Sequence, residues 1–346
     1  MLKFLKGNQI STLVLVCFAS LSYGQDFFKE IPYGNHKVNF YTEILTDSSR
    51  YWNKKDKIFR DVQIQLWFPV NGRNGKIIYS DYFYFLGKSN NYKSITNPKA
   101  RGERMHYFPA RHFKSDSLQL IELSNISMRA SRSNSLPKKI KKLIVFFSGA
   151  SGVPLNNTPL FELFATHGYT VLNFPSQSSN SEVSYRDNIE GGIKEQYLDA
   201  KFLLSFLRSS LSETQEIHLI GVSSGSIAAY NLLENNDLKV ASYVSLDGSV
   251  SYEIMKPFIS NYKIPLLNVR TLLAFRDAEG LNEEFLSNPS EESFKILKYD
   301  NLRHADFSAG PLLYRYVDNF YGPAKKDFIL SYESLIIEVL KFISEK

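Results

Sequence analysis

The sequence of 346 residues predicts an α/β domain, with a mostly parallel central sheet, helices on both of its faces and an antiparallel N-terminal edge. Three observations lead to this prediction. From Lys142 onward, short apolar runs alternate with amphipathic stretches, as expected for parallel strands joined by helices. Before that point, His36–Leu45 and Asp61–Val70 look like two strands joined by a polar turn. Small or polar loops directly follow the later strands, where parallel sheets bind ligands.

The N-terminal part is rich in strands and loops. Within Asp61–Val70, Val62, Ile64, Leu66 and Phe68 alternate with mostly polar residues, which predicts a half-buried antiparallel strand. Residues 90–135 have weak periodicity and many polar side chains. We interpret them as an irregular excursion that covers or shapes a pocket, either as a lid or as a fixed wall. We treat 25–346 as one domain, since its length suits a single large core.

The C-terminal part supplies the alternating elements. The expected strands are Leu143–Phe147, Thr170–Phe174, Glu216–Gly221, Val240–Leu246, Ile264–Val269 and Phe294–Tyr299. The expected helices are Leu160–His167, Asn188–Ser209, Ser224–Leu233 and Tyr332–Ile343. The second of these helices has an apolar stripe, and the first is closed by Gly168.

The first 24 residues predict a signal peptide. Lys3 and Lys6 precede the short apolar run Ser11–Leu21, and Ser22-Tyr23-Gly24 offers small residues before a cleavage site ahead of Gln25. We therefore expect a periplasmic or secreted protein without a stable membrane span after cleavage. Lipid attachment at Cys17 is an alternative that the bulky residue before it disfavours, and an uncleaved anchor is another.

Composition excludes several classes of function. Cys17 is the only cysteine, so after signal cleavage neither disulfides nor thiol chemistry are available. Removal of the signal peptide would lower the net charge of +6 by two units. The small positive excess that remains gives no reason to expect binding to nucleic acid. The histidines show no metal-ligand spacing. We interpret the run Lys138–Lys142 as a solvated loop ahead of a strand.

One segment carries the strongest chemical signal. Gly221-Val222-Ser223-Ser224-Gly225 lies between the expected strand Glu216–Gly221 and a helix, the context in which Gly-x-Ser-x-Gly forms a nucleophile elbow. Glycines at both ends let strand and helix pass closely around Ser223. A serine hydroxyl also needs a base and donors for the developing oxyanion.

Suitable partners follow the elbow in the sequence. His304, after the last expected strand, is the candidate base. Asp247, at the end of the strand after the elbow helix, is the first candidate for the acid that orients it, and Asp277 is the alternative acid. The backbone N–H groups of Ala150 and Ser224 are the candidate oxyanion donors.

These stretches resemble α/β-hydrolases of the group that includes platelet-activating-factor acetylhydrolases and dienelactone-hydrolase-like esterases. The resemblance is carried by the segments 146–152, 221–225, 245–249 and 304–307, and by Trp67-Phe68-Pro69. In the acetylhydrolase branch the acid follows the strand after the elbow, which favours Asp247, whereas many other α/β-hydrolases would favour Asp277. The chain departs from the group at Ser148, where His is common, and at Ser226, where Gly is common.

The resemblance implies a serine hydrolase that cleaves carboxylic esters through an acyl-enzyme, without metal or organic cofactor. The expected partner is a small-molecule or lipid ester with a small or moderate acyl group. Two alternatives stay open. One is a peptidase or amidase on the same fold, and the other is a non-catalytic envelope binding protein.

Overall fold

The computed structural model describes residues 26–72, 77–86, 93–94, 96–97, 99–100, 103, 113–150, 154–180, 182–234, 239–253, 258, 269–276 and 294–345. The expected signal peptide 1–24 lies outside these residues. Within the described part of the chain, no helix is both long and apolar enough to cross a membrane.

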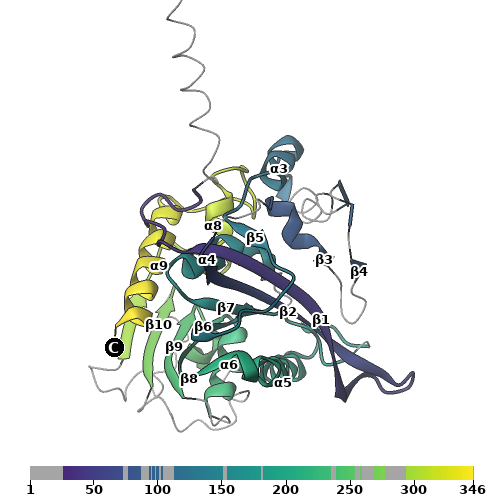
Figure 1. Ribbon diagram of the computed structural model, residues 1–346. Coiled ribbons are helices and arrows are strands. Elements are labelled where there is room, and N and C mark those ends of the chain that lie inside the picture. The colour runs from purple at the N-terminus through teal and green to yellow at the C-terminus, as the bar shows by residue number, and fades with distance from the viewer. Residues whose placement is uncertain are drawn as a thin grey trace, which may run out of the picture.

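Most of the described strands form one large sheet with the order β11-β10-β9-β8-β6-β7-β2-β1-β5 (Figure 1). Their bounds are β1 Lys37–Asn53, β2 Ile58–Val70, β5 Ala130–Arg132, β6 Ile140–Phe147, β7 Thr170–Asn173, β8 Leu211–Val222, β9 Val240–Leu246, β10 Arg270–Phe275 and β11 Phe294–Lys298. Two short strands, β3 Phe85–Leu86 and β4 Lys93–Ser94, pair with each other in a separate antiparallel sheet. Neighbouring strands in the series β7-β6-β8-β9-β10-β11 pair in parallel. Strand β2 pairs antiparallel with both β7 and β1. The predicted parallel sheet with an antiparallel N-terminal edge is therefore confirmed.

Helices cover both faces of the sheet, as predicted. Their bounds are α3 Ser117–Ser124, α4 Thr158–Thr166, α5 Ile189–Leu207, α6 Gly225–Glu234, α8 Gly310–Leu313 and α9 Phe328–Ser344. Figure 1 shows α5 and α6 on one face and α4 and α9 on the other. Along β6, Leu143, Val145 and Phe147 pack into the core beneath α5 and α6, while Ile144 and Phe146 pack into the opposite core. This period-two alternation follows from strand geometry.

The prediction that β2 is half-buried is wrong. Its polar-looking face is buried as well, with Gln63, Gln65 and Trp67 each at most 2% exposed. Trp67 packs against Phe161 of α4, with ring centroids 4.7 Å apart. The reason is tertiary, because β2 lies inside the sheet between β7 and β1 and has a helix on each side.

The strand expected at Ile264–Val269 falls mostly outside the described residues, since 264–268 are not among them. Val269, the last residue of the expected strand, is described and is not in a strand, so the predicted end is wrong. The next strand, β10, occupies Arg270–Phe275 and pairs in parallel with β9, with Leu273 opposite Ser245.

The excursion predicted at 90–135 is more ordered in its described part than expected. It contains α3 and the edge strand β5, which pairs in parallel with β1 through Val38 and Ala130. The buried carboxylate of Glu162, on α4, accepts hydrogen bonds from the Ala130 N–H at 2.8 Å and the Arg129 N–H at 3.0 Å. Burial raises the pKa of Glu162, against the effect of these hydrogen bonds. This contact fixes the end of the excursion to the core.

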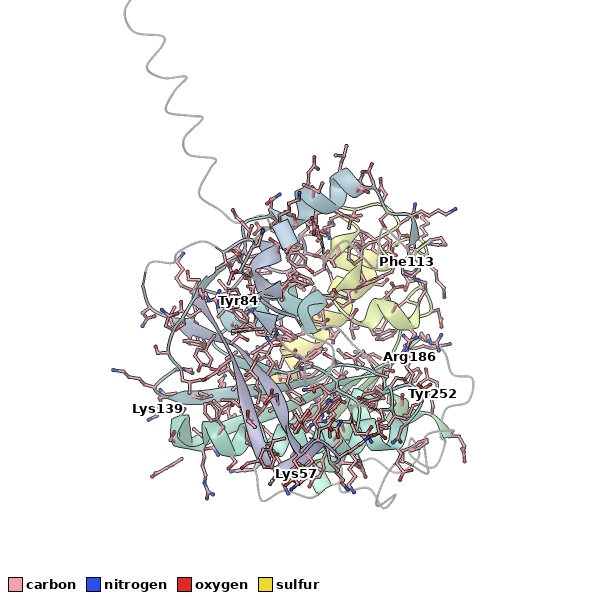
Figure 2. The ribbon with its side chains drawn as sticks, turned by 90° about the vertical axis from the view of Figure 1, so that its right-hand side faces the viewer. Lys57, Tyr84, Phe113, Lys139, Arg186 and Tyr252 are labelled. Atoms are coloured by element: carbon pink, nitrogen blue, oxygen red, sulfur yellow. The ribbon has the colours of Figure 1, made fainter. Side chains whose placement is uncertain are left out.

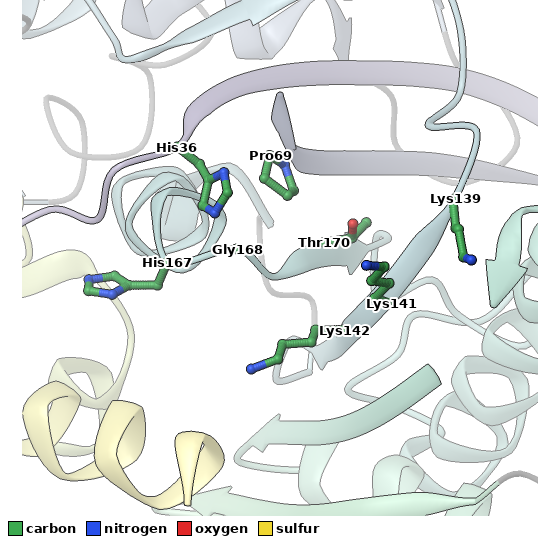
Figure 3. Close-up of a pocket in the computed structure, with 8 residues that line it drawn as sticks. All are labelled: His36, Pro69, Lys139, Lys141, Lys142, His167, Gly168 and Thr170. Carbon is green, nitrogen blue, oxygen red and sulfur yellow. The ribbon is translucent and has the colours of Figure 1, made fainter. Parts of the chain in front are cut away.

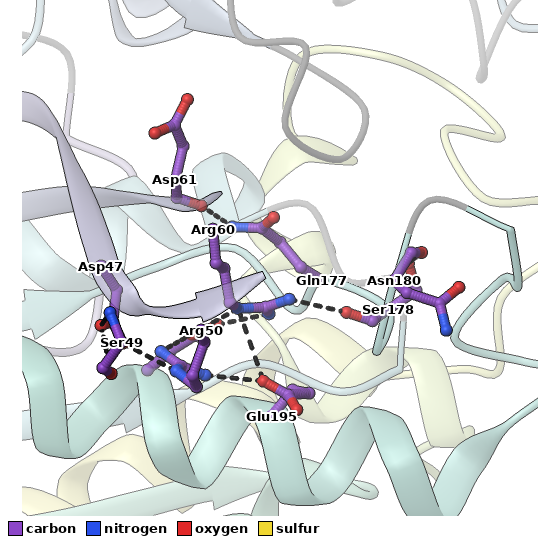
Figure 4. Close-up of polar contacts among 10 residues, drawn as sticks. Asp47, Ser49, Arg50, Arg60, Asp61, Gln177, Ser178, Asn180 and Glu195 are labelled. Carbon is purple, nitrogen blue, oxygen red and sulfur yellow. Dashed lines mark hydrogen bonds and ion pairs between the residues drawn. The ribbon is translucent and has the colours of Figure 1, made fainter. Parts of the chain in front are cut away.

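A buried ionic cluster joins the β1–β2 hairpin to α5 (Figure 4). The Arg60 guanidinium donates from Nε and Nη2 to the two oxygens of Asp199, at 2.7 Å each, and from Nη1 to the Ser178 carbonyl at 3.0 Å. Arg50 adds bonds to Asp199 at 2.8 Å and to Glu195 at 2.6 Å. Burial alone would lower the pKa of Arg60, but the Asp199 charge outweighs it and raises the pKa above the ordinary value. The cluster therefore holds α5 at a fixed position along the hairpin.

Candidate active site

The turn between β8 and α6 holds Ser223 in a left-handed backbone conformation, with φ of 54°. Neighbouring glycines make this turn feasible. A Cβ on Gly221 would lie 2.4 Å from the Ser226 Cα, and one on Gly225 would lie 2.4 Å from the Phe147 carbonyl oxygen. Any side chain at either position would collide with backbone, so the strand, the turn and the helix require glycine there. The predicted strand–turn–helix geometry around Ser223 is therefore observed.

His304 and Asp247 complete a hydrogen-bonded chain with this serine. His304 opens the short helix η7, His304–Phe307, which follows β11. Its Nε2 lies 3.0 Å from Ser223 Oγ, and its Nδ1 lies 2.5 Å from Asp247 Oδ2. Asp247 directly follows β9 and also has a positive φ, of 40°. Three residues at the carboxyl ends of three strands thus meet at one edge of the sheet.

The environment of Asp247 stabilises its ionised form. Its side chain is fully buried. Burial alone would raise the pKa, but the hydrogen bond and charge of His304 and further hydrogen bonds outweigh it, so the pKa lies below the ordinary value. The Tyr252 hydroxyl donates to Oδ1 at 2.8 Å, and the Arg276 N–H donates to the same oxygen at 3.2 Å. A carboxylate held this way stays charged and can orient the imidazole.

Sequence reasoning missed Tyr252 and Arg276. The guanidinium Nε of Arg276 lies 3.1 Å from Asp247 Oδ2, which gives the acid a second cationic partner. No local pattern identified either residue, because each reaches Asp247 only through the arrangement of β9 and β10. Asp277, the alternative acid, lies outside the described residues, although its neighbour Arg276 contacts Asp247.

The candidate oxyanion donors flank the nucleophile. Ser224 follows Ser223 in the turn, and the loop after β6 passes so close that a Cβ on Gly149 would lie 3.0 Å from the Ser223 Cβ. Ala150 is the next residue of that loop. In the described part of the chain, neither the Ala150 N–H nor the Ser224 N–H donates a hydrogen bond. Among the described residues, these two backbone donors near Ser223 therefore have no hydrogen-bond acceptor.

Ser226, one of the departures from the resembled group, has a structural role here. Its hydroxyl donates to the Ser223 carbonyl at 2.7 Å and accepts from the Val250 N–H at 3.2 Å. The Ser249 N–H also donates to the Ser223 carbonyl, at 3.0 Å. These bonds connect the turn at Ser223 to the segment that follows Asp247. They therefore fix the position of Ser223 relative to Asp247.

Asp306 anchors the loop that carries His304. Its carboxylate binds the Arg303 guanidinium through two bonds, at 2.8 and 2.7 Å, and accepts the Arg303 N–H at 2.8 Å. Asp306 is engaged with its own loop, as expected of a neighbour of the histidine. The His304 side chain remains 46% exposed, which leaves room for a substrate and for water.

A pocket of about 400 Å³ lies at the opposite end of the parallel strands (Figure 3). Its lining residues are His36, Pro69, Lys139, Lys141, Lys142, His167, Gly168 and Thr170. Figure 2 shows Lys139 and Tyr252 on opposite sides of the molecule. Lys141 and Lys142 belong to β6, so the interpretation of the whole lysine run as a loop is wrong for these two residues. This pocket includes none of the residues of the candidate site.

Comparison with known proteins bears on the fold. No family model matches the sequence, and no curated protein matches it. Among solved structures, a ferulic acid esterase from Streptomyces cinnamoneus has a TM-score of 0.63 and 16% identity, over 90% of this chain and 91% of its own. An esterase from Pyrococcus furiosus has a TM-score of 0.40 and 16% identity, over 59% of this chain and 83% of its own.

The likeness to the Streptomyces enzyme, together with the strand order, shows that the chain has an α/β-hydrolase fold. The predicted fold class is therefore confirmed. At this level of identity the likeness concerns the fold alone, so what the chain does is argued from the geometry of its own site.

Proposed function

We propose that this protein is an exported serine hydrolase that cleaves carboxylic esters and is related to the acetylhydrolase and dienelactone-hydrolase-like group. The observation that carries the proposal is the unbroken hydrogen-bonded chain from Ser223 through His304 to Asp247, mounted on a strained elbow. The lysine-lined pocket at the other end of the sheet has no comparable group of reactive side chains.

In the first half of the reaction, Ser223 Oγ attacks the ester carbonyl carbon. His304 Nε2, at 3.0 Å, takes the serine proton as the new C–O bond forms. The carbonyl oxygen becomes an oxyanion, which the N–H groups of Ala150 and Ser224 stabilise. When the C–O bond to the alcohol breaks, His304 returns the proton to the leaving oxygen and an acyl-enzyme remains.

In the second half, water replaces the alcohol. His304 takes a proton from the water as its oxygen attacks the acyl carbon, and returns that proton to Ser223 Oγ when the acid leaves. Asp247 remains ionised throughout and stabilises the imidazolium that forms in each half. Every step uses side chains or backbone groups of this chain, and none needs a metal or an organic cofactor.

The substrate is proposed as a small-molecule or lipid ester with a small or moderate acyl group. The half-exposed imidazole supports access of such a molecule from the edge of the sheet. One solved structure with the same fold is a ferulic acid esterase, which makes an aromatic acyl ester worth testing beside aliphatic ones. Export to the periplasm or the exterior follows from the N-terminal segment and remains part of the proposal.

The test is hydrolysis of nitrophenyl acetate, butyrate and octanoate and of methyl ferulate by the mature protein and by Ser223→Ala. Loss of the nucleophile is expected to lower kcat by roughly 10⁴-fold or more. Ser205→Ala is the matched control, because Ser205 is an exposed serine on α5. The activity of this variant should equal that of the parent protein.

Other outcomes select the alternatives. Preference for peptide anilides over every ester would make the protein an amidase or peptidase. Equal slow rates in Ser223→Ala and the parent protein, together with no labelling by a fluorophosphonate, would leave a binding protein with this fold. The ester hydrolase proposal fails in both cases.

A further inference from the structure

A buried amide near the candidate active site contacts one of the two loops that carry candidate oxyanion donors directly, and reaches the other through Tyr185. Gln196 is fully buried on α5. A buried primary amide has two donors and an acceptor that each cost free energy if they are left unpaired. The hydrogen-bond partners of Gln196 therefore indicate its structural role.

The nitrogen end of the amide holds the loop after β6. Gln196 Nε2 donates to the Ser148 carbonyl at 2.8 Å and to Ser176 Oγ at 2.9 Å. The Ser176 hydroxyl in turn donates to the same Ser148 carbonyl, at 2.9 Å. Ser148 stands two residues before Ala150, so this triangle fixes the backbone that presents the Ala150 N–H.

The oxygen end of the amide points toward the elbow. Gln196 Oε1 accepts from the Tyr185 hydroxyl at 3.3 Å, and that hydroxyl lies 3.4 Å from Ser224 Oγ. Burial raises the pKa of Tyr185 to about 12, so its hydroxyl keeps the proton that it donates. Gly192 leaves space for the ring, because a Cβ there would lie 2.7 Å from Tyr185 ring atoms.

We propose that Gln196 is a positioning residue that couples the two halves of the oxyanion hole, holding the Ser148 carbonyl through its nitrogen and the Tyr185–Ser224 pair through its oxygen. This inference rests on the proposed function, because it concerns the donors of that same reaction. Gln196 touches neither substrate nor reacting atoms, so it acts only through the two backbone segments.

The helix that carries Gln196 is well suited to this role. Glu195 and Asp199, on either side of Gln196 along α5, are bound by Arg50 and Arg60 of the hairpin. The helix therefore cannot slide or rotate easily relative to the sheet. Donors that are held in place before the reaction avoid reorganisation at the moment charge develops, and small displacements of such groups are costly.

The main experiment replaces the amide with an apolar side chain of similar length, Gln196→Met. We expect kcat for nitrophenyl butyrate to fall about 10- to 100-fold with KM nearly unchanged, because the lost interaction supports the transition state rather than the bound ester. Binding of a trifluoromethyl ketone, whose adduct with Ser223 carries an oxyanion, should weaken by a similar factor.

A matched control separates this effect from general damage to the core. Gln63 is also a buried glutamine, at 2% exposure, and its Nε2 donates to Thr42 Oγ1 at 3.1 Å, between β2 and β1. Gln63→Met should lower the melting temperature about as much as Gln196→Met while kcat stays at the parent value. A merely structural role of Gln196 would make the two variants alike in kcat.

Two weaker variants keep the test valid if Gln196→Met does not fold. Ser176→Ala removes one of the two donors to the Ser148 carbonyl, and Tyr185→Phe removes the link to Ser224. Because the bonds on the Ser148 side are the shorter ones, Ser176→Ala should lower kcat more than Tyr185→Phe does. Parent kcat in both variants would overturn the proposal.

The outcomes also distinguish this inference from the proposed function. If the parent protein hydrolyses esters, Ser223→Ala does not, and Gln196→Met retains the parent kcat, then the function stands and the role of Gln196 is refuted. If the parent protein and Ser223→Ala are equally inactive toward esters, the proposed function fails first and the role of Gln196 fails with it.

Discussion

Two buried aspartates of this protein, Asp199 and Asp247, have similar surroundings and different capabilities. Both side chains are fully buried, and each forms a bond to an arginine. Asp199 is held by Arg60, whose side chain is 1% exposed, and by Arg50, whose side chain is 16% exposed. Both partners carry permanent charges, so neither of them can exchange a proton with the carboxylate.

Asp247 instead has a partner that can change its charge. His304 is 46% exposed, and its second nitrogen faces Ser223 rather than solvent alone. The imidazole therefore lies between a buried carboxylate that stays ionised and a serine hydroxyl. Burial and an ion pair are common to both aspartates, so these two features alone do not identify a candidate catalytic acid. An accessible imidazole next to a candidate nucleophile is what distinguishes Asp247.

Among the variants that test the difference between the two aspartates, Asp247→Asn is expected to have the largest effect. An amide at this position favours the wrong tautomer of His304, so kcat should fall by roughly 10³- to 10⁴-fold. Nitrophenyl butyrate hydrolysis measures the loss, and urea unfolding checks that the fold persists. Retention of parent activity would mean that another group, such as Asp277, orients the histidine.

The opposite pattern is expected for Asp199→Asn. The change leaves the Arg60 guanidinium buried beside a neutral amide, which should lower the free energy of unfolding by about 3–5 kcal/mol. The kcat of the folded protein should change far less than it does in Asp247→Asn. Glu190→Gln, an exposed carboxylate on the same helix, is the control and should change stability by no more than about 0.5 kcal/mol. A large loss of kcat without a loss of stability would contradict the distinction between the two aspartates.

The smallest effect is expected for Arg276→Gln. The Arg276 guanidinium lies 3.1 Å from Asp247, but its side chain is 47% exposed, so solvent screens much of its attraction to the carboxylate. We expect kcat/KM of Arg276→Gln at neutral pH to change by no more than about fivefold, because exposed ion pairs contribute little.

Hydrolysis of nitrophenyl butyrate by Arg276→Gln should be measured beside Lys341→Gln. This control removes one positive charge from α9 instead of from the surroundings of Asp247. A loss of kcat/KM of more than about tenfold in Arg276→Gln alone would show that its side chain contributes more than an exposed ion pair does.

Much of this fold could be predicted because its elements have strong local signals. The helix expected at Asn188–Ser209 is α5 within two residues at each end, and the strand Val240–Leu246 was placed without error. The positions that failed are those where pairing overrides pattern. The edge strand β5 has too few residues to show a period, and β10 is held in the sheet by its ladders to β9 and β11.

By itself the sequence determined the elbow, the order Ser, Asp, His, and the loops from which the backbone donors come. These follow from short-range rules, because glycine at a crowded turn and small loops after apolar strands are readable along the chain. Only the tertiary structure decided that Asp247 meets His304, that Arg276 and Tyr252 surround it, and that Gln196 bridges the two donor loops. Those contacts join residues far apart in sequence, and their geometry depends on how strands and helices pack rather than on any local pattern.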